Sequence, residues 1–85
     1  MNLYIIAQCR KLLSGLGCDK HEYLFHINGH LIGEYVNFAY LRGDERLEVG
    51  EEYLLYVFLV KRKGKSIYGV ITSAKKISMI KRDFL

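Results

Sequence analysis

In the stretch Tyr53-Leu54-Leu55-Tyr56-Val57-Phe58-Leu59-Val60, all eight residues are apolar. Aromatic and β-branched side chains, which are enriched in strands, alternate here with leucine. Both sets of alternating positions are apolar, which is typical of a central strand or of a strand whose outer side is covered by a partner. The stretch is far shorter than the ~20 residues that a membrane-spanning helix needs. We therefore expect a long, well-covered strand here and no membrane association.

Short strand-like runs lie on both sides of this stretch, and Gly, Asn and Asp separate them in a sequence that contains no Pro. The other predicted strands are 3–13, 22–27, 30–40 and 66–73. Residues 74–80 are expected to form either a last short strand or a helical turn. Because the chain has 85 residues and no linker-like segment, we predict one domain over residues 1–80 and a short basic tail at 81–85.

The dipeptide Asn28-Gly29 predicts a tight β-hairpin, because both residues accept the positive φ that the favoured two-residue turns require. With a two-residue loop, Ile27 would pair with His30. The buried face would then carry the more apolar set of alternating residues, which is Tyr23, Phe25, Ile27, His30, Ile32, Val36, Phe38 and Tyr40. A bulge at the turn would shift this assignment for the residues that follow it.

The number of predicted strands favours a closed barrel. A hydrophobic content of 51% and a charged content of 26% exclude a disordered chain. Five or six strands in so short a chain would leave open edges that promote aggregation, and closure removes those edges. The predicted fold class is therefore all-β, a small five-stranded barrel.

Three segments carry a family resemblance. Segment 25–33 places two strand-like runs around Asn28-Gly29, segment 47–57 leads from a leucine, a glycine and charged residues into a strand, and segment 66–77 ends in Ser73-x-x-x-Ile77. Together they resemble an OB-fold, the small five-stranded Greek-key barrel that binds oligonucleotides or oligosaccharides. The resemblance implies a groove floored by the second and third strands, with the loop between the fourth and fifth strands as one wall. The segment between the third and fourth strands is short for the helix that many members have there.

Positive charge is concentrated at the C-terminal end of the sequence. The net charge is +4, from 13 Lys and Arg against 9 Asp and Glu. Residues 1–60 hold 5 basic and 8 acidic side chains, whereas residues 61–85 hold 8 basic and 1 acidic. The densest basic cluster lies at a predicted hairpin tip and consists of Lys61, Arg62, Lys63 and Lys65. Basic groups in the implied groove wall would neutralise phosphates, and a merely solvated tip that keeps a strand edge soluble is the alternative.

Aromatic side chains on the implied groove floor would stack on bases, at ~1–3 kcal/mol per base. The candidates are Tyr23, His26, His30, Tyr35, Tyr40 and Tyr68. The resemblance and the charge distribution together predict a non-catalytic domain that binds single-stranded DNA or RNA.

The spacing of cysteine and histidine raises two other kinds of site. Cys18, His21, His26 and His30 could supply four zinc ligands, but the predicted hairpin would place His26 and His30 on opposite faces. Cys18 lies close to His21, yet neither a third catalytic group nor an oxyanion hole accompanies the pair. We therefore expect no metal, no other cofactor and no enzymatic activity.

The number of apolar residues in strand 53–60 favours a second class of function. Because strand 53–60 is apolar on both sides, one barrel interior would not hold all of its side chains. A structural or adaptor protein would bury the remainder against a protein partner or against a second copy in a homodimer. Scattered surface tyrosines, whose hydroxyl groups are well solvated, are the simpler explanation.

The beginning of the sequence lacks the basic segment and the apolar run of a secretion signal. We expect a cytoplasmic protein with reduced cysteines.

Overall fold

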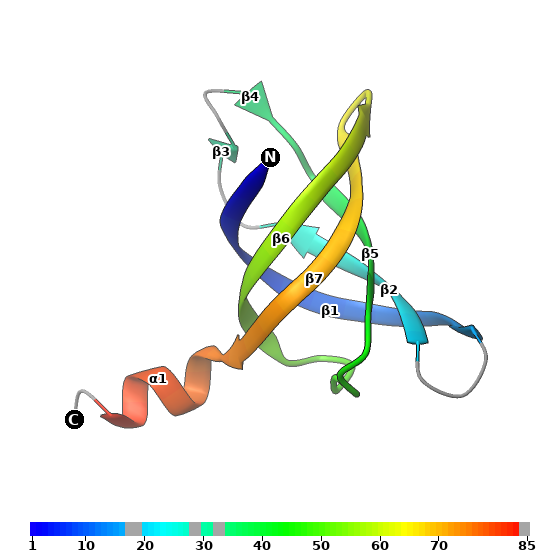
Figure 1. The fold of residues 1–85 in the computed structure, drawn as a ribbon. Helices are drawn as coiled ribbons and strands as arrows, with labels where there is room; N and C mark the ends of the chain where they lie inside the picture. Colours follow the sequence, from blue (N-terminus) through cyan, green and yellow to red (C-terminus); the bar gives the residue numbers. More distant parts are fainter. Residues whose placement is uncertain (17–19, 28–29, 32–33, 84–85) are drawn as a thin grey trace.

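Five strands form a closed barrel in the computed structural model, which describes residues 1–16, 20–27, 30–31 and 34–83, with the side chains of 1–13, 21–27 and 36–80 (Figure 1). The barrel strands are β1 (Asn2–Leu16), β2 (Lys20–Ile27), β5 (Phe38–Gly43), β6 (Glu52–Lys63) and β7 (Ser66–Lys76). Their order around the barrel is β1-β2-β5-β7-β6, and β6 returns to pair with β1. The β5–β7 pair is parallel, whereas the other pairs are antiparallel. The predicted all-β, five-stranded barrel is confirmed.

Three small elements lie outside the barrel. Within the connection from β2 to β5, β3 (His30–Leu31) and β4 (Glu34–Tyr35) pair with each other. Helix α1 (Ile77–Asp83) follows β7 directly and projects from one end of the barrel (Figure 1). Residues 74–80 are thus divided between the end of β7 and the start of this helix, which continues into the predicted tail. In the part of the chain that the structure describes, no helix is long and apolar enough to cross a membrane.

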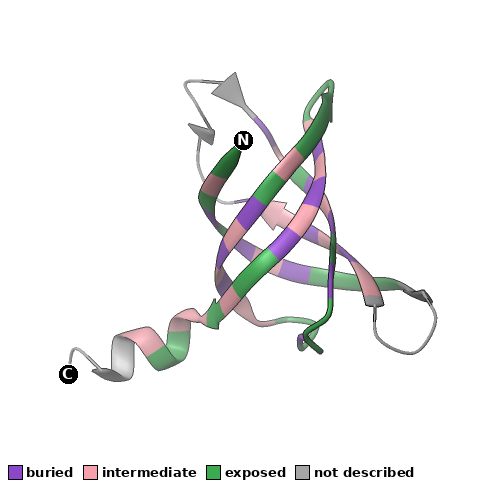
Figure 2. Ribbon diagram, viewed as in Figure 1, coloured by how far each residue is buried: buried purple, intermediate pink, exposed green. Residues whose placement is uncertain are grey.

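Alternating side chains fill the barrel interior, as the purple bands in Figure 2 show. In β6, Tyr53, Leu55 and Val57 are buried, whereas Phe58 and Val60 are exposed. A closed barrel has only one interior, so the second apolar set of β6 stays at the surface. The core consists of Ile5, Ala7, Cys9, Tyr23, Phe25, Ile27, Val36, Ala39, Leu41, Leu47, Tyr53, Leu55, Val57, Ile67 and Ile71.

The pairing predicted from Asn28-Gly29 is wrong, although these two residues lie outside the described part of the chain. β2 pairs with β5, and the Ile27 N–H donates a 2.8 Å hydrogen bond to the carbonyl oxygen of Asn37. Ile27 therefore does not pair with His30, which belongs to the separate β3–β4 pair. The chain makes a long excursion before it returns to β2, because nine residues separate Ile27 from Asn37 in the sequence.

This longer connection reverses the predicted faces of β5. Residues that pair across antiparallel strands lie on the same side of the sheet, and the buried Tyr23 pairs with Leu41, which is also buried. Phe38 and Tyr40, which the two-residue hairpin would place in the core, therefore point outward. Phe38 is 38% exposed.

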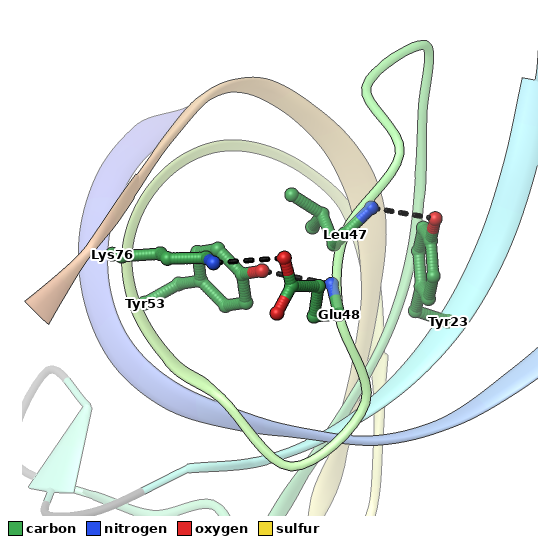
Figure 3. Close-up of polar contacts among 5 residues, drawn as sticks. All are labelled: Tyr23, Leu47, Glu48, Tyr53 and Lys76. Atoms are coloured by element: carbon green, nitrogen blue, oxygen red, sulfur yellow. Dashed lines mark hydrogen bonds and ion pairs between the residues drawn. The ribbon is translucent and has the colours of Figure 1, made fainter. Parts of the chain in front are cut away.

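Two core tyrosines hold the connection between β5 and β6 against one end of the barrel (Figure 3). The Tyr23 hydroxyl accepts a 2.9 Å hydrogen bond from the N–H of Leu47. The Tyr53 hydroxyl accepts a 2.8 Å hydrogen bond from the N–H of Glu48, and burial raises the pKa of Tyr53. The Glu48 carboxylate lies 2.9 Å from the Lys76 ammonium and raises the pKa of Lys76. The connection is held without a helix, because tyrosine hydroxyls accept from two of its backbone N–H groups and the Gly50 N–H donates to the carbonyl oxygen of Cys9.

A close approach of β6 to β7 requires glycine at position 69. The register of the two strands shifts between Leu59 and Lys61, next to the position where Gly69 faces Leu59. A Cβ atom on Gly69 would lie 2.4 Å from the carbonyl oxygen of Phe58. Because that oxygen belongs to the backbone, it cannot rotate away as a side chain would.

Gly69→Ala is expected to lower the free energy of unfolding by about 2 kcal/mol or more, because the new methyl group would push two backbones apart. Urea unfolding followed by circular dichroism measures the change. Gly64→Ala is the control, since a Cβ atom there meets nothing within 4 Å and carries only the cost of a φ of 60°, about 1 kcal/mol. Equal losses in the two variants would contradict the packing role of Gly69.

Tyr23→Phe is expected to lower the free energy of unfolding by about 1–3 kcal/mol, because the Leu47 N–H would lose its buried partner. The matched control is Tyr56→Phe, which alters a half-buried ring on the outer side of β6 and is expected to change stability by less than about 0.5 kcal/mol. Both variants are compared by thermal and urea unfolding. If Tyr23→Phe were no more destabilising than Tyr56→Phe, the hydroxyl would not be holding the connection.

Candidate nucleic-acid interface

One outer side of the barrel carries a row of side chains contributed by four strands. The row runs from Leu24 on β2 through Tyr40 on β5 and Tyr68 on β7 to Lys61 on β6, because these residues are in register. The rings of Tyr40 and Tyr68 are stacked, with centroids 5.0 Å apart and planes inclined by 11°. The Lys61 Nζ lies 5.0 Å from the Tyr68 centroid, within the range of a cation–π contact. We call this side the aromatic face, after His26, Phe38, Tyr40 and Tyr68.

A second pair of rings extends the aromatic face toward the β6–β7 turn. His26 and Phe38 are in register, and their ring centroids lie 5.6 Å apart in an edge-to-face arrangement. Phe38 and Tyr40 are two positions apart on β5 and so lie on the same side of the sheet. The aromatic face therefore extends over β2, β5 and β7.

The basic cluster of Lys61, Arg62, Lys63 and Lys65 lies beside this face, and we call it the basic hairpin. All four side chains are exposed. The turn is attached to the start of β5, since the Lys65 carbonyl oxygen accepts hydrogen bonds from the N–H groups of Asn37 (2.9 Å) and Phe38 (3.3 Å). This attachment fixes the position of the basic hairpin relative to the rings.

Strand alternation divides the cations of the basic hairpin between two sides. Lys61 and Lys63 are in register with Tyr68 and Ser66, so both start from the aromatic face. Arg62 lies between them and alternates to the other side, where its Nε donates a 3.1 Å hydrogen bond to the Gly64 carbonyl oxygen. We therefore expect Lys61 and Lys63 to act on a ligand of this face more directly than Arg62.

A hollow of about 220 Å³ opens on the aromatic face. Glu22 and Arg42 stand opposite each other in register at one side of it, and Tyr40 and Tyr68 contribute rings. The full lining is Glu22, Tyr40, Arg42, Val60, Lys61, Tyr68 and Gly69. The hollow thus combines a carboxylate, a guanidinium and aromatic rings in one small volume.

Tyr23 is a predicted site residue that lies elsewhere. Its side chain is 1% exposed inside the barrel, and its hydroxyl is bonded to the connection between β5 and β6. A ring in this position has no face open to a base. The remaining predicted residues with described side chains lie on or beside the aromatic face, namely His26, Tyr40, Lys61, Arg62, Lys63, Lys65 and Tyr68.

His30 and Tyr35 pair through their backbones as β3 and β4. Their side chains lie outside the described part of the chain. Their role in binding stays a prediction.

Phe38, Arg42 and Glu22 belong to this surface but are missing from the residues predicted to bind. A signal for the first two was present in segment 38–43, where one alternating set is Phe, Tyr and Arg and the other is Ala, Leu and Gly. An arginine is almost never fully buried unless it is paired, so the set that contains Arg42 belongs outside. The two-residue hairpin obscured this signal because it required the opposite assignment.

Some of the cysteines and histidines considered as metal ligands or nucleophiles lie in the described part of the chain. Among the described residues, no group of three or more His, Cys, Asp and Glu could hold a metal ion. Cys18 and the side chain of His30 lie outside those residues. Cys9 is buried in the core, and burial raises the pKa of its thiol. A protonated thiol in this environment is a packing group.

A second outer surface is formed by β1 and β6, and we call it the apolar face. Tyr4 pairs with Tyr56, and Ile6 pairs with Leu54. The two tyrosine rings have centroids 4.5 Å apart. Tyr4 is 66% exposed and Phe58, the next outward residue of β6, is 45% exposed. The apolar side chains of strand 53–60 that do not fit in the barrel interior therefore lie on this face.

The barrel thus presents two distinct surfaces, one with rings and cations and one with rings and aliphatic side chains. Comparison of the chain with protein-family models, with curated proteins and with solved structures finds no match. The geometry and charge of the two surfaces are therefore the basis for assigning a function.

Proposed function

We propose that this chain is an OB-like barrel that binds single-stranded nucleic acid on the aromatic face and catalyses no reaction. A closed five-stranded barrel is compatible with the Greek-key arrangement of that family. The second and third strands of the barrel, β2 and β5, would floor the groove, and the basic hairpin between β6 and β7 would be its wall. This is the arrangement that the sequence resemblance implied.

The row of Tyr40, Tyr68 and Lys61 is the observation that carries this proposal. Bases stack on aromatic rings with little regard to sequence, at ~1–3 kcal/mol per base. Tyr40 stacks on Tyr68 from β5, and Lys61 contacts Tyr68 from β6 on the other side of β7. A base would therefore reach the Tyr68 ring by displacing the Lys61 ammonium, which would then be free to pair with a phosphate. Displacement of Lys61 would therefore allow a base to stack on Tyr68 and a phosphate to be neutralised at the same time.

The charge distribution along the barrel supports the same proposal. The basic hairpin lies at one end of the barrel, and the connection between β5 and β6 lies at the other (Figure 1). That connection carries Asp44, Glu45, Glu48 and Glu51. At the second end these carboxylates are partly balanced by cations such as Lys76, which pairs with Glu48. Phosphates would therefore be attracted most strongly to the basic hairpin.

Binding to about 12-nucleotide single strands of DNA and RNA is expected to weaken about 100-fold between about 50 mM and about 300 mM salt, because the basic hairpin would release the counterions of about four phosphates into solution. Replacing Lys61, Arg62, Lys63 and Lys65 together by Ala is expected to remove most of this salt dependence and to weaken binding alike for all sequences. Fluorescence anisotropy with labelled oligonucleotides measures both effects.

The control variant removes two cations away from the aromatic face, with the exposed Arg46 and Lys75 replaced by Ala, and it is compared with the paired replacement of Lys61 and Lys63 by Ala. It is expected to retain most of the affinity. Absence of binding at low salt, or binding that ignores salt, would overturn the proposed function. An equal loss of affinity in the two variants would show that binding depends on net charge alone and not on the position of the basic hairpin.

The apolar face favours a second candidate function, that of a self-associating structural or adaptor subunit. Its cross-strand pairs of Tyr4 with Tyr56 and Ile6 with Leu54 form an uncharged surface. In a two-fold dimer each copy would present the same surface to the other, so apolar side chains would meet apolar side chains. We propose a second copy of this chain as the occupant of the apolar face. Binding of nucleic acid on the aromatic face would remain open in such a dimer.

Phe58→Glu is expected to dissociate this dimer, because it would bury two carboxylates in an apolar contact. Val49→Glu is the matched control, since Val49 is also exposed but lies in the connection between β5 and β6. Sedimentation equilibrium is expected to give a dimer for the unaltered chain and for Val49→Glu, and a monomer for Phe58→Glu. A monomer for the unaltered chain at high micromolar concentration would contradict self-association.

A further inference from the structure

The hollow on the aromatic face contains a carboxylate, which a site that only neutralises phosphates would avoid. Glu22 lines the hollow together with Arg42 and Lys61. It is half-buried and faces Arg42 in register across β2 and β5. Within the described residues, its carboxylate makes no hydrogen bond and no salt bridge. A negative group in the middle of a phosphate-binding surface lowers affinity unless it recognises something other than a phosphate.

The size of the hollow limits what it can recognise. Its volume of about 220 Å³ is below the ~300–1,000 Å³ of ordinary small-molecule sites. Gly69 contributes only backbone to its lining, while Tyr40 and Tyr68 contribute flat rings. A space of this size with aromatic walls suits one planar base from a bound strand.

The polar groups of the hollow discriminate among the four bases. A carboxylate accepts two hydrogen bonds and donates none, whereas a guanidinium donates and accepts none. Guanine has two adjacent donors, N1–H and the N2 amino group, and two adjacent acceptors, O6 and N7. Adenine, cytosine and thymine or uracil each lack the pair of adjacent donors. A site that offers one carboxylate and one guanidinium is therefore complementary to guanine.

We propose that the hollow receives a single guanine base of the bound strand, a proposal that rests on the proposed nucleic-acid function. Glu22 accepts hydrogen bonds from guanine N1–H and from the N2 amino group. Arg42 donates to O6 and N7, the commonest specific contact between arginine and a base. The stacked rings of Tyr40 and Tyr68 line the same hollow beside the base, and Lys61 is left to neutralise the adjoining phosphate. The domain is then a binder of single strands with a preference for one base at one position.

The competing explanation is an ion pair that Glu22 and Arg42, which face each other in register, would form by a change of rotamer. It would hold β2 to β5 at the surface and would give no preference among bases. Removing its negative charge would then strengthen the binding of every strand alike. The two explanations therefore differ in the ratio of the affinity for a guanine-containing strand to the affinity for the other strands. This ratio does not depend on how tightly the protein binds overall.

The experiment compares four labelled single strands of about 12 nucleotides by fluorescence anisotropy. Each is oligothymidylate, with one central position occupied by guanine, adenine, cytosine or thymine. The unaltered chain is expected to bind the guanine strand at least about fivefold more tightly than the other three. Glu22→Gln is expected to reduce the ratio of the affinity for the guanine strand to the affinity for the all-thymine strand to less than about twofold.

Two further variants separate recognition from charge and from shape. Glu45→Gln makes the same change of charge on an exposed residue of the connection between β5 and β6, and it is expected to retain the preference for guanine. Arg42→Lys keeps the positive charge but loses the forked geometry, and it is expected to lower the ratio of the affinity for the guanine strand to the affinity for the all-thymine strand.

Equal affinity of the unaltered chain for all four strands, with binding that still weakens in salt, would overturn the guanine site and leave the proposed function standing. Retention of the guanine preference in Glu22→Gln would likewise overturn the assignment of Glu22. If none of the strands bound at low salt, the proposed function itself would fail, and the guanine site with it.

Discussion

Pairing between β1 and β6 closes the sheet, and most other features of the molecule depend on that closure. The ladder extends from Asn2 opposite Phe58 to Gln8 opposite Glu52, so neither strand has a free edge along this length. Closure creates one interior of limited volume, which accepts one alternating set of side chains from each strand. The second apolar set of β6 must then lie outside, where it forms the apolar face. Gly69 allows β7 to approach β6 closely enough for the ladder on the other side of β6 to form.

The same closure brings distant parts of the sequence together on the aromatic face. β5 and β7 pair in parallel, which places Tyr40 beside Tyr68 although 27 residues separate them in the sequence. The backbone hydrogen bonds from Asn37 and Phe38 to Lys65 then attach the basic hairpin to the start of β5. A cluster of cations that would otherwise belong to a freely moving tip is thus held beside a stacked pair of rings. This proximity distinguishes a candidate groove from a solvated hairpin end.

The fold could be predicted further from the sequence than the site could. Strand-forming residues, the absence of proline and the need to remove edges indicated a five-stranded barrel, and the basic hairpin was recognisable as a run of charges between two strands. Phe38 and Tyr40 were placed in the core because Asn28-Gly29 favoured a two-residue turn. Tyr23 belongs both to the set of side chains predicted to be buried and to the predicted groove floor, and the structure buries it. Periodicity identifies its face but does not reveal that its hydroxyl bonds a connection more than twenty residues away.

The sequence by itself determined the fold class and the concentration of positive charge, because strand propensity, alternation and charge are local properties of the chain. Only the tertiary structure decided which side of β5 is inside, since that depends on whether an odd or an even number of residues separates two paired strands. It also decided that Glu22, Arg42, Tyr40 and Tyr68 line one hollow. Their proximity depends on the register of three strands in a closed barrel, and register is set by the packing of the whole core.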